Sequence, residues 1–170
     1  MSGPDDPEIR IERVLPDDWE SYRDIRLEML LDALDAFWFT HADEVGHTEE
    51  EWRSQVERAW LISAHLDGEV VGSAGLGTSA EPGLEGRAFL WGMYVSPRAR
   101  GKAVGERLVC AVLDEARGRG LSEVFLQVTS ANAAAVALYE RCGFIPTGRT
   151  EPHPRRSDLV EIDMVRRLDR

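Results

Sequence analysis

Basic and small residues gather in one turn between a predicted strand and a predicted helix. Residues 95–108 read V-S-P-R-A-R-G-K-A-V-G-E-R-L. A turn of this kind directs unpaired backbone N–H groups, the positive end of a helix dipole and an arginine side chain toward one point. Its small residues let a ligand approach the backbone closely. The segment therefore predicts a site for a phosphate or pyrophosphate group, although an ordinary tight turn with glycines would have a similar pattern.

A second segment places polar groups on one face of a later predicted helix. Asn132 lies at the expected start of this helix, where its side chain can cap the backbone or bond to a ligand amide. Tyr139 follows seven residues later, two turns along nearly the same face, and the alanines at 133–135 leave room for an elongated ligand. A phenol in this position can reach a bound group. The alternative is a core tyrosine with a satisfied hydroxyl.

The elements that must position these two segments alternate between strands and helices. Asp67-Gly68 predicts a hairpin turn, and the mostly apolar run 124–129 predicts a central strand. Strands are expected at 9–15, 60–66, 70–77, 87–95, 124–129, 144–148 and 159–165, and helices at 16–34, 49–59, 104–117 and 132–142. Residues 35–48 show no periodicity. The order favours a mixed sheet with helices on both faces.

Composition and charge limit the classes of protein and of partner. The 170 residues fit a single domain, expected over 9–170 after a disordered polar tail at 1–8. The net charge of −11 argues against non-specific binding to nucleic acid or to an anionic membrane, and no apolar run is long enough to span a membrane. Cys110 and Cys142 are too few for a disulfide framework, which favours a reducing compartment, the cytoplasm.

Together the two segments resemble the GNAT superfamily, the GCN5-related N-acetyltransferases. The acyl-CoA motif of that family, Arg/Gln-x-x-Gly-x-Gly/Ala, is matched here by Arg100, Ala103 and Gly105. The strand at 93–97 (M-Y-V-S-P) and the helix at 132–144 also fit the family. The resemblance covers residues 89–148 well. The N-terminal third resembles the family only in the succession of its elements.

The resemblance implies a fold, a co-substrate and a reaction. The fold is α/β: a mixed, mostly antiparallel sheet of about seven strands, with helices on both faces and an acyl-CoA cleft between the two central parallel strands. The co-substrate is acetyl-CoA, and the acceptor is a primary amine on a small molecule, a peptide or a protein. The amine attacks the thioester directly in a ternary complex, without a metal or a covalent enzyme. Family members often dimerise, so a homodimer is allowed, although no feature of this sequence identifies an interface.

The same resemblance implies roles for individual residues. Met93 and Val95 would pair with pantetheine through their backbones, like an added strand. Tyr139 would donate a proton to the departing CoA thiolate. The residues implied in binding the co-substrate are Met93, Tyr94, Val95, Arg100, Gly101, Lys102, Ala103, Val104, Gly105, Glu106, Asn132, Ala135 and Tyr139.

Two features depart from the family pattern. Ala103 replaces the first glycine of the motif; the added methyl is expected to weaken binding modestly, since the N–H group remains. Many family members also carry a carboxylate on the strand before the motif, where this chain reads R-A-F-L-W-G at 87–92. Glu85 precedes that strand and is expected to lie too far out. The base is left open among Glu44, His41, His47, a water chain to solvent, and an amine that is already neutral.

Three adjacent aromatic residues, Phe37-Trp38-Phe39, lie in the unpatterned segment. They can cover an edge of the core. Alternatively, they wall an acceptor groove together with Glu44 and the loop 151–158, because binding sites are often assembled from irregular loops. On this second hypothesis Trp38, Glu44 and Trp91 are the substrate-contacting candidates.

Other patterns in the chain point to weaker interpretations. The G-L-G-T-S-A segment at 75–80 fits a dinucleotide fingerprint, but Pro82 and Gly83 follow where a helix must begin. His41, Glu44 and His47 have metal-ligand spacing on sequence that is more typical of a polar loop, so no metal is expected. Cys142 lacks an evident partner for nucleophilic chemistry. The rival functions are a non-catalytic acyl-CoA sensor, a protein that uses only its surface as a scaffold, and a transferase of a longer acyl group.

Overall fold

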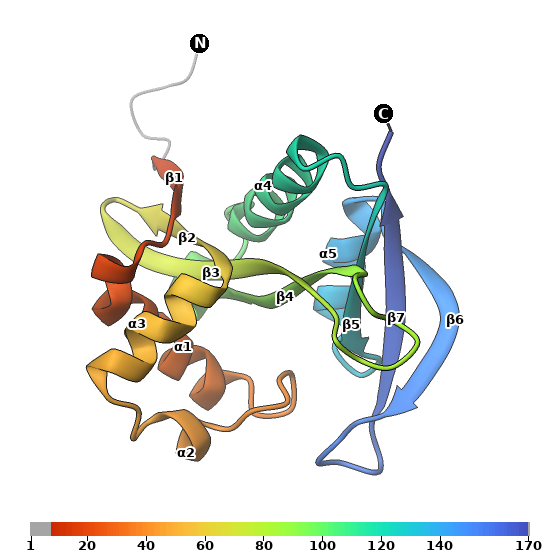
Figure 1. The fold of residues 1–170 in the computed structure, drawn as a ribbon, viewed down its shortest axis with the longest axis horizontal. Coiled ribbons are helices and arrows are strands. Elements are labelled where there is room, and N and C mark those ends of the chain that lie inside the picture. The colour runs from red at the N-terminus through yellow and green to blue at the C-terminus, as the bar shows by residue number, and fades with distance from the viewer. Residues whose placement is uncertain (1–7, 170) are drawn as a thin grey trace.

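A seven-stranded sheet forms the centre of the structure, a computed structural model that describes residues 8–169 (Figure 1). The strand order is β1-β2-β3-β4-β5-β7-β6. The strands are β1 (Ile9–Arg13), β2 (Trp60–Leu66), β3 (Glu69–Thr78), β4 (Ala88–Val95), β5 (Glu123–Thr129), β6 (Ile145–Pro152) and β7 (Val160–Arg167). The helices are α1 (Trp19–Asp32), α2 (His41–Glu44), α3 (Glu49–Arg58), α4 (Val104–Gly118) and α5 (Ala133–Arg141), with short 3-10 turns η1 (Pro16–Asp18) and η2 (Pro97–Ala99).

The middle of the sheet is where its regular pairing is weakest. β4 and β5 run parallel and pair in register only at Phe89 and Phe125, whereas the other neighbouring strands of the described sheet are antiparallel. On the other side of β4, Ser73 faces Tyr94 and Gly75 faces Trp91, so two residues of β4 lie opposite one residue of β3. This bulge bends β4 away from regular pairing. β4 and β5 therefore separate toward the C-terminal end of β4, which leads to the basic turn.

Each face of the sheet carries its own hydrophobic core. On one face α4 packs through Leu108, Val109 and Val112 against apolar residues of the sheet. On the other, α1 and α3 pack around Met29 and Trp52. Figure 1 shows α4 on one side of the strands and α1, α2 and α3 on the other. The predicted mixed fold, mostly antiparallel and with helices on both faces, is thus confirmed.

The predicted elements agree with the observed ones apart from shifts of a few residues at their ends. One addition lies within 35–48, where the short helix α2 starts at a capping box: Thr40 N–H donates to Asp43 Oδ2 at 2.7 Å, and Asp43 N–H to Thr40 Oγ1 at 3.3 Å. The predicted polar tail lies outside the described residues except for Glu8. Within residues 8–169, no helix combines the length and apolarity needed to cross a membrane.

Candidate active site

The basic turn leads into α4 without a side-chain cap. Gly101 (φ +75°) and Ala103 (φ +61°) both adopt the left-handed conformation, and α4 begins at Val104. No side chain within the described part of the chain caps the first turn of α4. The turn and the start of the helix line a cavity of about 730 Å³, named here the turn cavity, whose other wall is α5. Uncapped amides at the positive end of a helix dipole make this cavity suited to an anion.

The charged side chains around the turn cavity are mostly paired. Arg100 donates from Nη2 to Asp32 Oδ2 at 2.5 Å and from Nε to the Val95 carbonyl at 3.1 Å. Glu106 accepts a hydrogen bond from Arg141 Nε at 3.0 Å. Lys102 is exposed and does not line the cavity. An anion here would therefore be bound mainly by backbone N–H groups, with the guanidinium groups beside it already balanced by carboxylates.

The strand β4 forms the floor of the turn cavity. Met93, Tyr94 and Val95 all line it. The Tyr94 side chain is buried, and its hydroxyl donates to Asp32 Oδ2 at 3.0 Å, so the ring belongs to the packing between α1 and the sheet. Gly105 closes the packing above, because a Cβ there would lie 3.0 Å from Leu138 Cδ2 and 3.3 Å from Met93 Cε. Tyr94 thus contributes backbone to the cavity, and a side chain at Gly105 would require Leu138 and Met93 to shift.

Two polar residues of the second segment connect the turn cavity to a neighbouring cavity of about 470 Å³, named here the aromatic cavity. Tyr139 and Asn132 line both cavities, as do Ala135 and Met93. Asn132 Oδ1 caps α5 by accepting from the Ala135 N–H group at 3.2 Å. The Tyr139 ring packs edge-on against Phe144, and its hydroxyl makes no hydrogen bond with another described residue. Burial, with a smaller contribution from Cys142, raises the pKa of Tyr139 far above its ordinary value, so the phenol keeps its proton.

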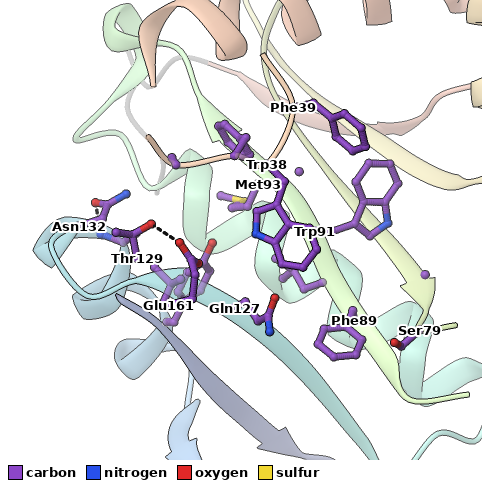
Figure 2. Close-up of a pocket in the computed structure, with 18 of the residues that line it drawn as sticks. Trp38, Phe39, Ser79, Phe89, Trp91, Met93, Gln127, Thr129, Asn132 and Glu161 are labelled. Carbon is purple, nitrogen blue, oxygen red and sulfur yellow. Dashed lines mark hydrogen bonds between the residues drawn. The ribbon is translucent and has the colours of Figure 1, made fainter. Parts of the chain in front are cut away.

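The aromatic cavity has one wall made of large rings. Trp38, Trp91 and Phe89 line this wall, and Figure 2 shows their side chains across the cavity from Thr129 and Glu161. The Trp91 indole lies over Gly75 and Gly77 of β3, where added Cβ atoms would come within 2.6 Å and 3.2 Å of the ring. The glycine pair that mimics a dinucleotide fingerprint therefore provides the flat surface on which this indole rests.

The loop that carries Trp38 is held from the far end of the chain. Arg155, in the connection between β6 and β7, donates to the Leu34 carbonyl at 2.7 Å and to the carbonyl of Phe37. Arg156 pairs with Asp35 at 2.9 Å. Trp38 is nonetheless half exposed. Two segments far apart in the sequence, 33–40 and 153–159, are thereby joined beside the cavity, although the loop 151–158 does not itself line it.

The candidate bases named from the sequence lie elsewhere. Glu44 is buried and accepts two hydrogen bonds from Arg26, at 2.9 Å from Nε and 2.6 Å from Nη2. Burial acts to lower the pKa of Arg26, but its bonds to Glu44 outweigh this and leave it raised, so the guanidinium group stays charged. Glu44 and His47 line a third cavity on the outer side of Trp38, and neither they nor His41 line the aromatic cavity. Glu85 is exposed and accepts from the Gly83 N–H group at 2.9 Å.

A polar wall, which the sequence did not single out, faces the aromatic rings. It consists of Gln127 and Thr129 of β5, Glu161 of β7, and Glu81 from the loop after β3. Thr129 and Glu161 are cross-strand partners, and the Thr129 hydroxyl donates to Glu161 Oε1 at 2.7 Å (Figure 2). The alternation of polar and apolar residues in 159–165 identified a polar face of this strand. That face turns into the cavity, so Glu161 is buried.

The matched sequence profile decides the family. Residues 18–144, three quarters of the chain, match the Acetyltransferase (GNAT) family. The chain belongs to the GNAT family. Its turn cavity lies at the acyl-CoA motif of that family, and its parallel pair β4–β5 occupies the position that the resemblance implies for the acyl-CoA cleft.

Several proteins named as acetyltransferases are similar to this chain in sequence or in fold. An IAA acetyltransferase from Azospirillum brasilense is 36% identical over 93 residues, which cover 55% of this chain and 59% of that protein. A mycothiol acetyltransferase from Renibacterium salmoninarum is 30% identical over 120 residues, covering 66% of this chain and 36% of that protein. The chain thus spans only part of these relatives. A putative acetyltransferase from Salmonella typhimurium, solved with its cofactor acetyl-CoA, superposes with a TM-score of 0.79 at 22% identity, covering 96% of this chain and 95% of that one.

Proposed function

We propose that this protein transfers the acetyl group of acetyl-CoA to a primary amine. The observation that carries the proposal is the junction of two cavities at Tyr139. One is lined by the uncapped start of α4, and the other by aromatic rings and the buried carboxylate of Glu161. An elongated polyanion fits the first and an amine fits the second. Membership in the GNAT family supports the same assignment.

The residues present fit acetyl-CoA. The left-handed turn at Gly101 and Ala103 and the uncapped amides of α4 would hold its pyrophosphate. Ala103 adds a methyl where the family motif has glycine and keeps the N–H group. Met93 and Val95, at the separation of β4 from β5, would hold the pantetheine arm, with Asn132 beside it. When bound, acetyl-CoA supplies a thioester carbonyl that an amine can attack and a thiolate that can leave.

The chain's own residues would supply orientation and a proton. Tyr139 remains a neutral phenol at every working pH, because burial raises its pKa. Its hydroxyl lacks a partner among the described residues and lines both cavities, so it is free to donate to the sulfur as the carbon–sulfur bond breaks. The walls of the two cavities would bring the amine and the thioester together and exclude water.

A thiol-release assay tests this function. The protein is mixed with acetyl-CoA and a panel of primary amines, and free CoA is detected with a thiol reagent. We expect amine-dependent release with at least one member of the panel. A rise in melting temperature with acetyl-CoA but no release with any amine would instead support an acyl-CoA sensor, and faster release with succinyl-CoA would support a longer acyl donor.

A further inference from the structure

We infer that Glu161 is the catalytic base for the acceptor amine, and that the acceptor is a primary amine carried on an aromatic or extended apolar body. The inference rests on the proposed acetyl transfer and assigns the two features which that proposal leaves open, the base and the acceptor class. It follows from the pairing of the carboxylates around the aromatic cavity, from the position of Glu161 in that cavity, and from the chemistry of the opposite wall.

Arginine pairing separates Glu161 from the other carboxylates nearby. Glu44 is held by Arg26. Arg149 bridges three more: Glu81 at 3.0 Å, Asp163 at 3.2 Å, and Glu151. Glu161 has no arginine or lysine within ion-pair distance among residues 8–169. A carboxylate without a cation in a cavity is the one free to receive a cationic ligand.

The carboxylate of Glu161 is held by the Thr129 hydroxyl and lies near the ring of His153. Its side chain is 96% buried, and the Thr129 hydroxyl fixes Oε1 at 2.7 Å. His153 is fully buried; its Nδ1 accepts from the Arg155 N–H group at 3.1 Å, which leaves the ring proton on Nε2. Nε2 lies 3.9 Å from Glu161 Oε1 and is itself without a hydrogen-bond partner in the described part of the chain. Both contacts involve Oε1, so Oε2 is left for a ligand on the cavity side.

Other ionisable groups surround Glu161 and set the field that its carboxylate experiences. They are Arg26, Glu81 and Tyr139 on the aromatic cavity, His153 beside the carboxylate, Asp35 next to Thr129, Glu151 directly opposite Glu161 on β6, and Arg149 and Asp163 farther along the sheet. Arg26 pairs with Glu44 and Asp35 pairs with Arg156, whereas Arg149 is shared by Glu81, Glu151 and Asp163. One guanidinium cannot balance three carboxylates, so this side of the sheet keeps a net negative charge that favours a cationic ligand. Glu161 is the buried carboxylate on the aromatic cavity that has no arginine or lysine partner among the described residues.

The wall opposite Glu161 selects the body of the amine. Trp38, Trp91 and Phe89 present ring faces, and a buried aromatic or apolar group gains free energy against them in proportion to its area. A protonated amine is attracted to the same rings and to the carboxylate across from them. A short polar amine would pair with Glu161 but leave the aromatic rings uncovered. An arylalkylamine would pair with Glu161 through its ammonium group and pack against the rings with its aryl group.

The proton balance of the reaction fits this arrangement. The ammonium form gives one proton to Glu161 and becomes nucleophilic; its nitrogen then forms a bond to the thioester carbon, and the carbon–sulfur bond breaks. The nitrogen loses a second proton as the amide forms. Tyr139 gives its hydroxyl proton to the sulfur and regains one from the nitrogen through solvent. The net change is one amide, one CoA thiol and one proton released to water.

A Glu161→Gln variant assayed against 2-phenylethylamine tests the inference. Glutamine keeps the shape and can still accept from Thr129, but it cannot take a proton. We expect kcat/KM at pH 7 to fall by about 10²–10⁴-fold. We also expect kcat/KM of the variant to rise about tenfold per pH unit toward the amine's own pKa near 10, because only the neutral amine then reacts. The wild-type profile should level off at a lower pH. Thr129→Val, which loses the positioning bond, should lose about fivefold.

Three comparisons make the result decisive. Glu123→Gln removes a carboxylate at the far end of β5 that lines neither the turn cavity nor the aromatic cavity, and it should match the wild type. The KM of the wild type for 2-phenylethylamine should be well below that for ethylamine. Equal KM values would overturn the inference that the acceptor amine carries an aromatic or extended apolar body. A Glu161→Gln protein with a normal rate and a normal pH profile would overturn the assignment of Glu161 as the catalytic base. Absence of thiol release by the wild type with every amine would instead remove the proposed function itself.

Discussion

Replacing Tyr139 by phenylalanine removes one oxygen atom from the junction of the two cavities. In the structure this hydroxyl makes no hydrogen bond with another described residue, so its loss sacrifices none of the roughly 1 kcal/mol that such a bond contributes. The ring keeps its edge contact with Phe144. We expect a melting temperature within about 2 °C of the wild type, since 1 kcal/mol corresponds to about 2–4 °C in a protein of this size.

The same change should affect catalysis strongly. Loss of the proton donor to sulfur is expected to lower kcat about 10²-fold, equivalent to about 2.7 kcal/mol of transition-state stabilisation. The affinity for acetyl-CoA, measured by calorimetry, should change by less than about threefold, because kcat and binding are separable when a group acts only in the transition state. The matched control is Tyr22→Phe. Tyr22 is also buried and in edge contact with an aromatic ring, but it lines the third cavity, the one that contains Glu44 and His47. An unchanged kcat for Tyr139→Phe across the pH range would refute the role of this phenol.

Three further perturbations have defined outcomes. Gly105→Glu should abolish acetyl-CoA binding, measured as loss of the thermal shift, because even a Cβ at this position would come 3.0 Å from Leu138 Cδ2, and the added charge would meet the pyrophosphate. Trp38→Ala should raise KM for the acceptor about tenfold and leave the acetyl-CoA affinity unchanged, since about 1.4 kcal/mol of ring contact would be lost. Burial raises the pKa of Tyr22 to about 12, whereas an unfolded tyrosine ionises near 10. The stabilisation from its neutral phenol is therefore present below pH 10 and is lost as the pH rises to about 12. Over that interval the free energy of unfolding of the wild type should fall by up to about 3 kcal/mol more than that of Tyr22→Phe, measured by urea unfolding at each pH.

For each of these three substitutions, one experimental result would contradict the prediction. Micromolar acetyl-CoA affinity in Gly105→Glu would show that the pyrophosphate binds elsewhere. Equal effects of Trp38→Ala on acceptor and acetyl-CoA would mean that the indole supports the whole site rather than the acceptor. Parallel stability curves for the wild type and Tyr22→Phe up to pH 12 would show that this phenol ionises as it does in water.

The fold and one half of the site could be predicted from the sequence because their determinants are local. The basic turn, its small residues and the following amphipathic helix are contiguous, and so are Asn132 and Tyr139. Trp38 lies in the predicted irregular segment and lines the aromatic cavity, while its role as an acceptor contact remains a prediction. The roles of these residues, the cytoplasmic location and the homodimer remain predictions.

The other half of the site depends on pairings between distant segments. Glu161 and Thr129 meet because β5 and β7 are neighbours, and Glu44 is removed from the list of bases by an arginine 18 residues earlier. Periodicity identified the polar face of 159–165, but polar faces are usually solvated, and nothing in that strand alone shows that its polar side is covered. Once the strand order is known, the sequence does contain a signal: Glu161 and Asp163 of β7 lie directly opposite Thr129 and Gln127 of β5, so polar side chains face one another across the two strands.

The glycine floor beneath Trp91 has a consequence for how this protein could diversify. A methyl at residue 75 would come within 2.6 Å of the indole and force the ring to move, and one at residue 77 would come within 3.2 Å and displace it slightly. Neither residue lines the turn cavity proposed to hold the nucleotide. The depth of the acceptor compartment is thus governed by two positions on a strand behind it. Exchange of Gly77 for alanine should shift preference from bulky toward slender amines with the chemistry intact, which offers a route to new selectivity without rebuilding the catalytic groups.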